Sequence, residues 1–243
     1  MQKYILILSL FLSVTSVATS YTVVSDYDDT IKKTNVASPI DTVLNSFFSE
    51  SVFIGVSEYY SNLKEAELYI LTGTPPFLKD NVVKTLKAVN VTNFKLAQKE
   101  LPEDVIVFKT RLLESLLKQG KGPFVLIGDD TQHDPQIYSD FQKKYPEKVL
   151  AIHIRRISNR RAAVGVNYFY STYELTYLEF LAGRISAATV NSAANAVTKN
   201  KKSENQFPKY ATCPDSVHQI TPIANTAQFI FIRDYLVNLC KTR

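Results

Sequence analysis

Cysteine and histidine are both scarce in this chain of 243 residues. Cys213 and Cys240 are the only cysteines, and neither lies beside a recognisable catalytic base, which argues against a cysteine nucleophile. In an oxidising compartment they could form a disulfide between a C-terminal linker and the last helix, and two buried free thiols are the alternative. There are three histidines, and His133 is expected to be a surface loop residue rather than a ligand.

Long apolar runs are missing except at the N-terminus. Met1–Lys3 is a short basic start, Tyr4–Val14 is apolar, and Ser16–Ser20 supplies small residues for cleavage. The apolar run is too short to span a bilayer comfortably. We therefore predict a signal peptide at residues 1–20 and an exported protein, either periplasmic or secreted. An uncleaved first strand or a membrane anchor is the alternative.

Signals for nucleic-acid binding are also lacking. The formal net charge is +5, but the sequence has no aromatic platform and no known nucleic-acid-binding motif, so we expect no nucleic-acid partner. Basic residues do gather in Arg155–Arg161, which could contact anionic lipid headgroups or could simply be solvated. The roughly 220 residues after the predicted signal are enough for one domain with a substantial core.

Short apolar runs alternate with amphipathic stretches along the chain, which is typical of a parallel sheet with helices on both faces. Strands are predicted at 22–25, 68–71, 93–96, 124–127 and 149–154, and helices at 41–48, 55–63, 77–88, 109–119 and 134–145. We therefore predict an α/β fold with a Rossmann-like parallel sheet over residues 21–165.

The last third of the chain has a different pattern. Tyr170–Leu181 is an aromatic-rich amphipathic stretch, Thr198–Pro214 is a polar linker, and Thr226–Leu239 has one apolar face. Residues 166–243 are therefore predicted to form a helical extension that packs on the core.

Carboxylate and hydroxyl side chains stand where predicted strands end. Asp26 and Asp28 follow the first strand, Thr72 follows the second, and Asp129 follows the fourth. Lys109 opens a predicted helix between the last two. Ligands of open parallel sheets bind outside the carboxyl ends of the strands, so these five residues form the candidate site.

This set resembles the haloacid dehalogenase-like superfamily of phosphohydrolases, whose motifs are Asp-x-Asp-x-Thr, a strand-end Ser or Thr, a Lys, and Gly-Asp with a following acidic residue. Segments 24–32, 53–60, 126–138 and 151–155 are similar to the catalytic domain of the actin-patch-associated phosphatidate phosphatases and their bacterial relatives. The resemblance covers about residues 21–157. Those relatives usually have a tryptophan after the second motif, whereas this chain has Pro76 and Phe77 there and no tryptophan at all.

The resemblance implies a magnesium-dependent phosphomonoester hydrolase. Asp26 would attack phosphorus and form an aspartyl-phosphate, while Asp28 would protonate the leaving oxygen and then activate water. Asp26, the backbone carbonyl of Asp28, and Asp129 would hold Mg²⁺. Thr72 would donate a hydrogen bond to a phosphoryl oxygen, and Lys109 would add positive charge.

Two more acidic residues of the fourth motif admit two interpretations each. Asp134 precedes Pro135, so it could cap a helix or act indirectly at the metal. Asp130 could be a second acidic partner of the metal or a solvated loop residue, and the loop interpretation is favoured.

The segments where relatives with large lids insert whole domains are short here, at 34–65 and 75–108, so the cap should be minimal and the site open. An open site suits a substrate with its own bulk. We therefore expect phosphatidate or a related lipid phosphate as substrate, with peripheral membrane contact. The alternatives are a phosphatase of phosphoproteins or soluble phosphate esters, and a non-catalytic interaction protein on the same scaffold.

Overall fold

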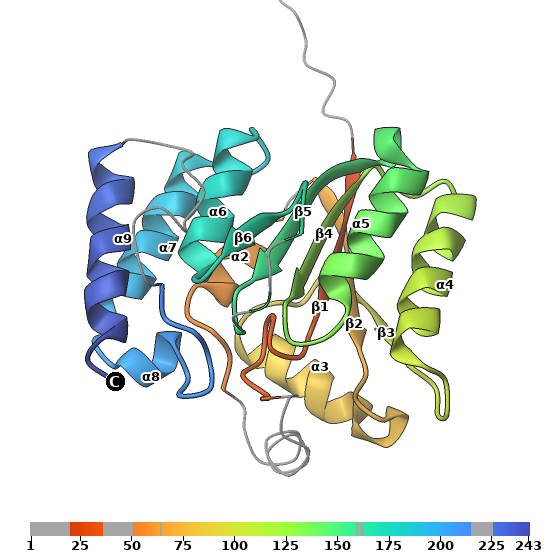
Figure 1. The fold of residues 1–243 in the computed structure, drawn as a ribbon, viewed down its shortest axis with the longest axis horizontal. Coiled ribbons are helices and arrows are strands. Elements are labelled where there is room, and N and C mark those ends of the chain that lie inside the picture. Colours follow the sequence, from red (N-terminus) through yellow and green to blue (C-terminus); the bar gives the residue numbers. More distant parts are fainter. Residues whose placement is uncertain (1–19, 36–50, 64, 159, 161–162, 215–225) are drawn as a thin grey trace, which may run out of the picture.

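The computed structural model describes residues 20–35, 51–63, 65–158, 160, 163–214 and 226–243 (Figure 1). The predicted helix at 41–48 and all but the last residue of the predicted signal peptide lie outside these ranges. No helix among the described residues is both long and apolar enough to cross a membrane.

A six-stranded sheet forms the centre of the described structure, with strand order β3-β2-β1-β4-β5-β6 and parallel pairing throughout. Its strands are β1 (Tyr21–Asp26), β2 (Ala66–Thr72), β3 (Lys95–Gln98), β4 (Phe124–Asp129), β5 (Val149–Arg155) and β6 (Asn167–Phe169). The predicted α/β class is confirmed. The motif-bearing strands β1 and β4 are neighbours, with Ser25 opposite Ile127, as the resemblance implied.

Each central strand is buried on both faces because its apolar side chains alternate between two cores. Val23 and Val125 contribute to one hydrophobic cluster, while Val24 and Leu126 contribute to the other. Such strands are held rigidly, so the residues at their carboxyl ends have well-defined positions.

Helices cover both faces of the sheet. One face packs against α4 (Val105–Lys118) and α5 (Asp134–Lys144), and the other against α2 (Val56–Tyr60) and α3 (Lys79–Ala88). Short 3₁₀ turns, η1 (Pro76–Leu78) and η2 (Pro146–Lys148), precede α3 and β5.

The C-terminal region is helical, as predicted, but it begins with a strand: β6 adds to the sheet beside β5. The helices α6 (Thr172–Leu181), α7 (Ala187–Lys199), α8 (Ser203–Gln206) and α9 (Ala227–Cys240) gather beyond that edge (Figure 1). Tyr173, Tyr177 and Phe229 pack together there, so these three aromatic residues are core residues, whereas Phe231 is exposed. The predicted linker contains the end of α7 and all of α8.

Helix α4 starts earlier than predicted. Its N-cap is Asp104, whose carboxylate accepts hydrogen bonds from the backbone N–H groups of Ile106 and Val107. The prediction that Lys109 opens the helix was wrong, because the β-branched run at 105–107 has weak helix propensity and the cap overrides it. Lys109 therefore lies in the second turn of α4.

Candidate active site

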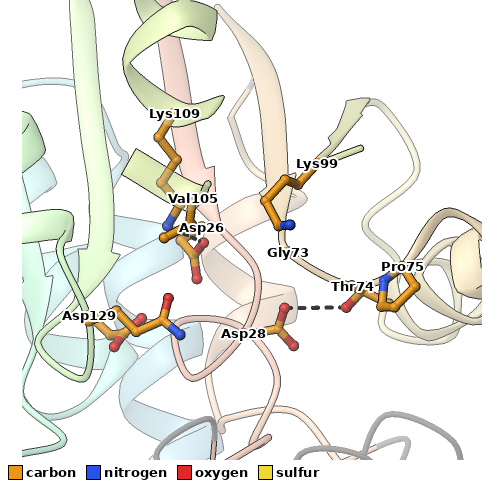
Figure 2. A pocket seen from close by; sticks show the side chains of 10 residues that line it. Asp26, Asp28, Gly73, Thr74, Pro75, Lys99, Val105, Lys109 and Asp129 are labelled. Carbon is orange, nitrogen blue, oxygen red and sulfur yellow. Dashed lines mark hydrogen bonds and ion pairs between the residues drawn. The ribbon is translucent and has the colours of Figure 1, made fainter. Parts of the chain in front are cut away.

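The predicted site residues meet at the carboxyl edge of the sheet, around a pocket of about 220 Å³. Asp26, Asp28, Lys109 and Asp129 line it, and Thr72 lies beneath it as the last residue of β2. Figure 2 shows the three carboxylates arranged around one space, with Lys99 and Pro75 on its other side.

Asp26 and Lys109 form a buried ion pair at the base of the pocket. Lys109 Nζ lies 2.6 Å from Asp26 Oδ1 and 2.5 Å from Asp134 Oδ1, and all three side chains are almost inaccessible to solvent. Burial raises the pKa of Asp26, an effect that Lys109 opposes and that Asp134 and Asp129 reinforce. Burial by itself would lower the pKa of Lys109, but Asp134 and Asp26 raise it well above its usual value, so the ammonium stays charged.

Asp134 is not the helix cap considered from the sequence. The N-cap of α5 is His133, which is exposed as expected, and Asp134 is the first helical residue. Its Oδ1 accepts from Lys109, whereas its buried Oδ2 has no hydrogen-bond partner among the described residues. A buried carboxylate oxygen without a donor is costly, so this atom needs a ligand that the protein alone does not provide.

Asp129 completes a cluster with Asp26 and Asp134 in which one oxygen from each residue lies within 4.8 Å of the others. Gly128 allows this approach, because a Cβ there would lie 2.7 Å from the Cβ of Asp134. Burial, reinforced by Asp134, raises the pKa of Asp129 to about 8. Thr131 holds Asp129 in place by donating its backbone N–H and its hydroxyl to Oδ1.

Asp28 is held by three hydroxyl groups. Thr72 and Thr74 donate to its Oδ2 at 2.9 and 3.3 Å, and Thr34 donates to its Oδ1 at 3.0 Å. Burial raises the pKa of Asp28, while the hydrogen bonds from Thr72 and Thr34 oppose that rise. Thr72 therefore orients Asp28 in this structure, a contact that the sequence did not predict.

Asp130 is neither a metal partner nor a solvated loop residue, so the favoured interpretation was wrong. It is 1% exposed, and its Oδ1 accepts 2.7 Å hydrogen bonds from the backbone N–H groups of Ile157 and Ser158. The carboxylate thus fastens the loop after β5 to the loop after β4. Neither donor is near Asp130 in sequence, so this contact could not be predicted from local pattern.

Arg155 does not belong to a surface for lipid headgroups. Its guanidinium is buried between the rings of Phe53 and Phe169, and its Nε donates to the backbone carbonyl of Thr30 at 3.0 Å. Arg156, 18% exposed, lies over Tyr168 and near Asp130. The predicted basic surface therefore loses its first two members to internal contacts.

Six lining residues were not among the predicted site residues: Gly73, Thr74, Pro75, Lys99, Val105 and Gln132. Lys99 follows β3, and its Nζ donates to the backbone carbonyl of Glu103 at 2.7 Å. Its position one residue beyond the carboxyl end of a strand was the available signal. Among the described lining residues none comes from the C-terminal region, so the helical extension packs beside the sheet, away from the pocket.

The donor set fits a hard divalent cation. Asp26, Asp129 and Asp134 bring three buried carboxylates, whereas Lys109 brings one positive charge to them. Magnesium prefers carboxylate and water oxygens, and a divalent ion would balance the remaining charge and supply the partner that Asp134 Oδ2 lacks.

Comparison with known proteins agrees with this geometry. A family model described as the catalytic domain of the phosphatidate phosphatase APP1 matches residues 21–156. An uncharacterized protein of Schizosaccharomyces pombe is 26% identical over 151 residues, a match that covers 56% of this chain and 25% of that protein. The chain thus spans about a quarter of the length of this curated relative. No solved structure gave a significant match.

Proposed function

Because this chain belongs to the family of the phosphatidate phosphatase APP1 catalytic domain, we propose that it hydrolyses the phosphomonoester of phosphatidate or a related lipid phosphate. The observation that carries the proposal is the convergence of Asp26, Asp28, Lys109 and Asp129 on one pocket. A scaffold that only binds a partner has no need of a nucleophile, a second carboxylate and a buried ammonium in that arrangement.

In the first step, an oxygen of Asp26 attacks phosphorus and the bond to the ester oxygen breaks, which leaves an aspartyl-phosphate. Asp28 gives its proton to the departing alkoxide. The raised pKa of Asp28 supports this assignment, because a general acid must hold a proton near neutral pH. Lys109 donates to Asp26 Oδ1, which holds the nucleophile in position for attack and opposes the rise in its pKa.

In the second step, Asp28 removes a proton from water, the water oxygen attacks phosphorus, and the bond to Asp26 breaks. Thr72 and Thr74 keep the carboxylate of Asp28 oriented in both steps. A magnesium ion held by Asp26, Asp129 and Asp134, with the backbone carbonyl of Asp28, would neutralise charge on the phosphoryl oxygens.

The test is a hydrolysis assay with phosphatidate vesicles, phosphopeptides and p-nitrophenyl phosphate, each with magnesium or with a chelator. Wild type should release phosphate only with the metal, and Asp26→Asn should lose activity by a factor of about a thousand or more, since no other nucleophile can form the intermediate. Asp234→Asn, the same change at an exposed position of α9, is the matched control and should retain full activity.

Trapping the intermediate tests the mechanism separately. Asp28→Asn should slow hydrolysis of the aspartyl-phosphate, so acid quenching should recover phosphate on the peptide that contains Asp26. Equal turnover of Asp26→Asn and wild type would end the assignment. Activity on phosphopeptides without activity on phosphatidate would favour the phosphoprotein alternative.

Export is proposed on separate grounds. The basic and apolar start of residues 1–20 is followed by β1 at Tyr21, and Cys213 and Cys240 form a disulfide, which is favoured in oxidising compartments. Sequencing the N-terminus of the mature protein from the culture medium or periplasm tests this. A retained Met1 would contradict it.

A further inference from the structure

Exposed apolar side chains lie on the segments that supply one side of the phosphate pocket. Phe77, Leu101, Ile106 and Val107 are 73%, 64%, 40% and 56% exposed, respectively. We refer to these four residues as the apolar rim. Isolated exposed apolar residues are ordinary on a protein surface, whereas a group of them beside a pocket is typical of an interaction site.

Each rim residue lies within two positions of a residue that lines the pocket. Phe77 follows Pro75, Leu101 follows Lys99, and Ile106 and Val107 follow Val105. The rim thus comes from three segments at the carboxyl edge of the sheet. Two are connections, from β2 to α3 and from β3 to α4, and the third is the first turn of α4. Figure 1 shows these connections at the same end of the sheet, on the side of β2 and β3.

Contacts between these segments keep the rim together. Gln98 Nε2 donates to the backbone carbonyl of Thr74 at 3.4 Å, which joins the end of β3 to the loop that leads to Phe77. Leu101 and Arg111 border one shallow depression, and Arg111 lies one turn after Val107 on α4. These contacts hold the three segments next to one another on one side of the pocket, and Ile106 also lines a groove between α4 and α5 with His133 and Phe141.

The charges of these segments do not favour an electrostatic docking site. Each cation there has an anion close to it. Lys79 precedes Asp80 in the sequence, Lys99 precedes Glu100, and Arg111 forms an ion pair with Glu103. A surface without excess positive charge gains little from anionic headgroups, whereas its apolar side chains can partition into the acyl boundary of a bilayer.

From this geometry we infer that the apolar rim inserts into the surface of a phospholipid bilayer and brings the mouth of the phosphate pocket to the headgroup layer. The inference rests on the proposed function in one respect: a lipid-phosphate substrate would lie in a bilayer, so the bilayer surface would have to contact the mouth of the pocket. The contact is predominantly apolar, so it requires no anionic lipid and persists at high salt.

The test compares two triple variants of equal composition. The rim variant is Phe77→Ser/Leu101→Ser/Val107→Ser. The control variant, Phe231→Ser/Leu181→Ser/Val164→Ser, changes the same residue types at exposed positions on α9, α6 and the loop before β6. Flotation with vesicles of phosphatidylcholine alone measures binding without any need for catalysis.

Wild type and the control variant should float with the vesicles at low and high salt, and the rim variant should bind about tenfold more weakly or worse. The rim variant should also show a higher apparent KM for phosphatidate in vesicles, with unchanged turnover of p-nitrophenyl phosphate. The second readout separates loss of docking from misfolding.

Equal vesicle binding by the rim variant and wild type would overturn the inference. So would failure of wild type to bind phosphatidylcholine vesicles, which would leave a protein surface as the occupant of the rim. Neither result depends on phosphatase activity: a chain that hydrolyses no phosphate ester can still float with vesicles, and an active enzyme can fail to float.

Discussion

At the residue scale, the site is defined by three carboxylates that share one buried space with a single ammonium group. Lys109 donates to both Asp26 and Asp134, and Asp129 lies close enough to complete a trio of carboxylates that could hold a metal ion. Burial raises the pKa of Asp26 and Asp129 because each carboxylate loses water and faces another anion. A cation bound between these carboxylates would favour their ionised forms, so binding would release protons.

The first prediction follows from Asp129, whose pKa is about 8 in the metal-free protein. At about pH 7 this carboxyl is mostly protonated, and a carboxylate that binds a metal must be ionised. Magnesium binding should therefore release about one proton from Asp129, to which any proton held by Asp26 adds, and affinity should rise with pH up to at least about pH 8.

Titration calorimetry in two buffers of different ionisation enthalpy measures this release. Asp234→Asn should behave as wild type, because that residue lies on the exposed side of α9. Identical binding heats in the two buffers would contradict the prediction.

At the element scale, buried polar contacts fasten the C-terminal helices to the sheet. Glu179 of α6 accepts hydrogen bonds from Arg184 and lies 2.7 Å from His153 Nε2 of β5. Near the site, Tyr210 donates to Asp29, which also accepts from the backbone N–H groups of Thr34 and Asn35. The loop that carries Asp28 is thus braced by a segment about 180 residues away.

The second prediction concerns Glu179. Burial by itself would raise its pKa, but the hydrogen bonds from Arg184 and His153 lower it from 4.5 to about 2. Between these pH values the unfolded state binds more protons than the folded state, so stability falls as the pH falls. The contribution of the ionised Glu179 to the free energy of unfolding is about 3 kcal/mol. It is complete above about pH 4.5 and is lost below about pH 2.

Urea unfolding of wild type and Glu179→Gln at about pH 6 and about pH 2 measures this contribution of Glu179 to stability. The difference in unfolding free energy between the two proteins should shrink at the lower pH, because protonation removes the charge that the substitution lacks. A difference that is constant with pH would show that the carboxylate charge contributes nothing to stability.

At the scale of the whole molecule, two hydrophobic clusters lie on opposite faces of one parallel sheet, and the pocket lies at its carboxyl edge. The C-terminal region closes one flank through α9, which the disulfide Cys213–Cys240 joins to the segment after α8. The open alternative for the two cysteines is thereby decided in favour of the disulfide.

The third prediction is that removing this disulfide destabilises the protein without damaging the pocket. A cross-link between residues 27 positions apart restricts the unfolded chain. Cys213→Ser/Cys240→Ser should therefore lower the free energy of unfolding by about 3.5 kcal/mol.

Thermal or urea unfolding checks the loss of stability, and hydrolysis of p-nitrophenyl phosphate well below the unfolding transition checks the pocket. Reduced wild type is the matched control and should resemble the double variant. Unfolding curves that coincide with those of oxidised wild type would contradict the prediction.

Features encoded by short stretches of chain were predictable. The strand ending at Asp26 is an apolar run followed directly by acids, and the strand ending at Asp129 has the same form, so both positions followed from local pattern. The boundaries of the elements were predicted less accurately. The strand predicted at 93–96 lies at Lys95–Gln98, and α4 begins at Val105 because Asp104 caps it.

Partners that come from distant segments were not predictable. Asp130 meets Ile157 and Ser158, and Arg155 meets Phe53 and Phe169, so residues that looked like surface charges are internal. The environment of a charged side chain depends on which segments pack over it, and these segments cannot be identified from the residues next to it in the sequence.

The amino-acid sequence by itself determined the alternation of strands and helices, the acids at strand ends and the family, because each depends on periodicity or on neighbouring residues. Only the tertiary structure decided that Lys109 joins Asp26 to Asp134, that Arg155 is buried, and that apolar residues such as Phe77 and Leu101 are exposed on segments that lead away from the pocket. These features arise where connections far apart in the chain meet at one edge of a parallel sheet, so they depend on packing between segments and not on the order of residues within any one of them.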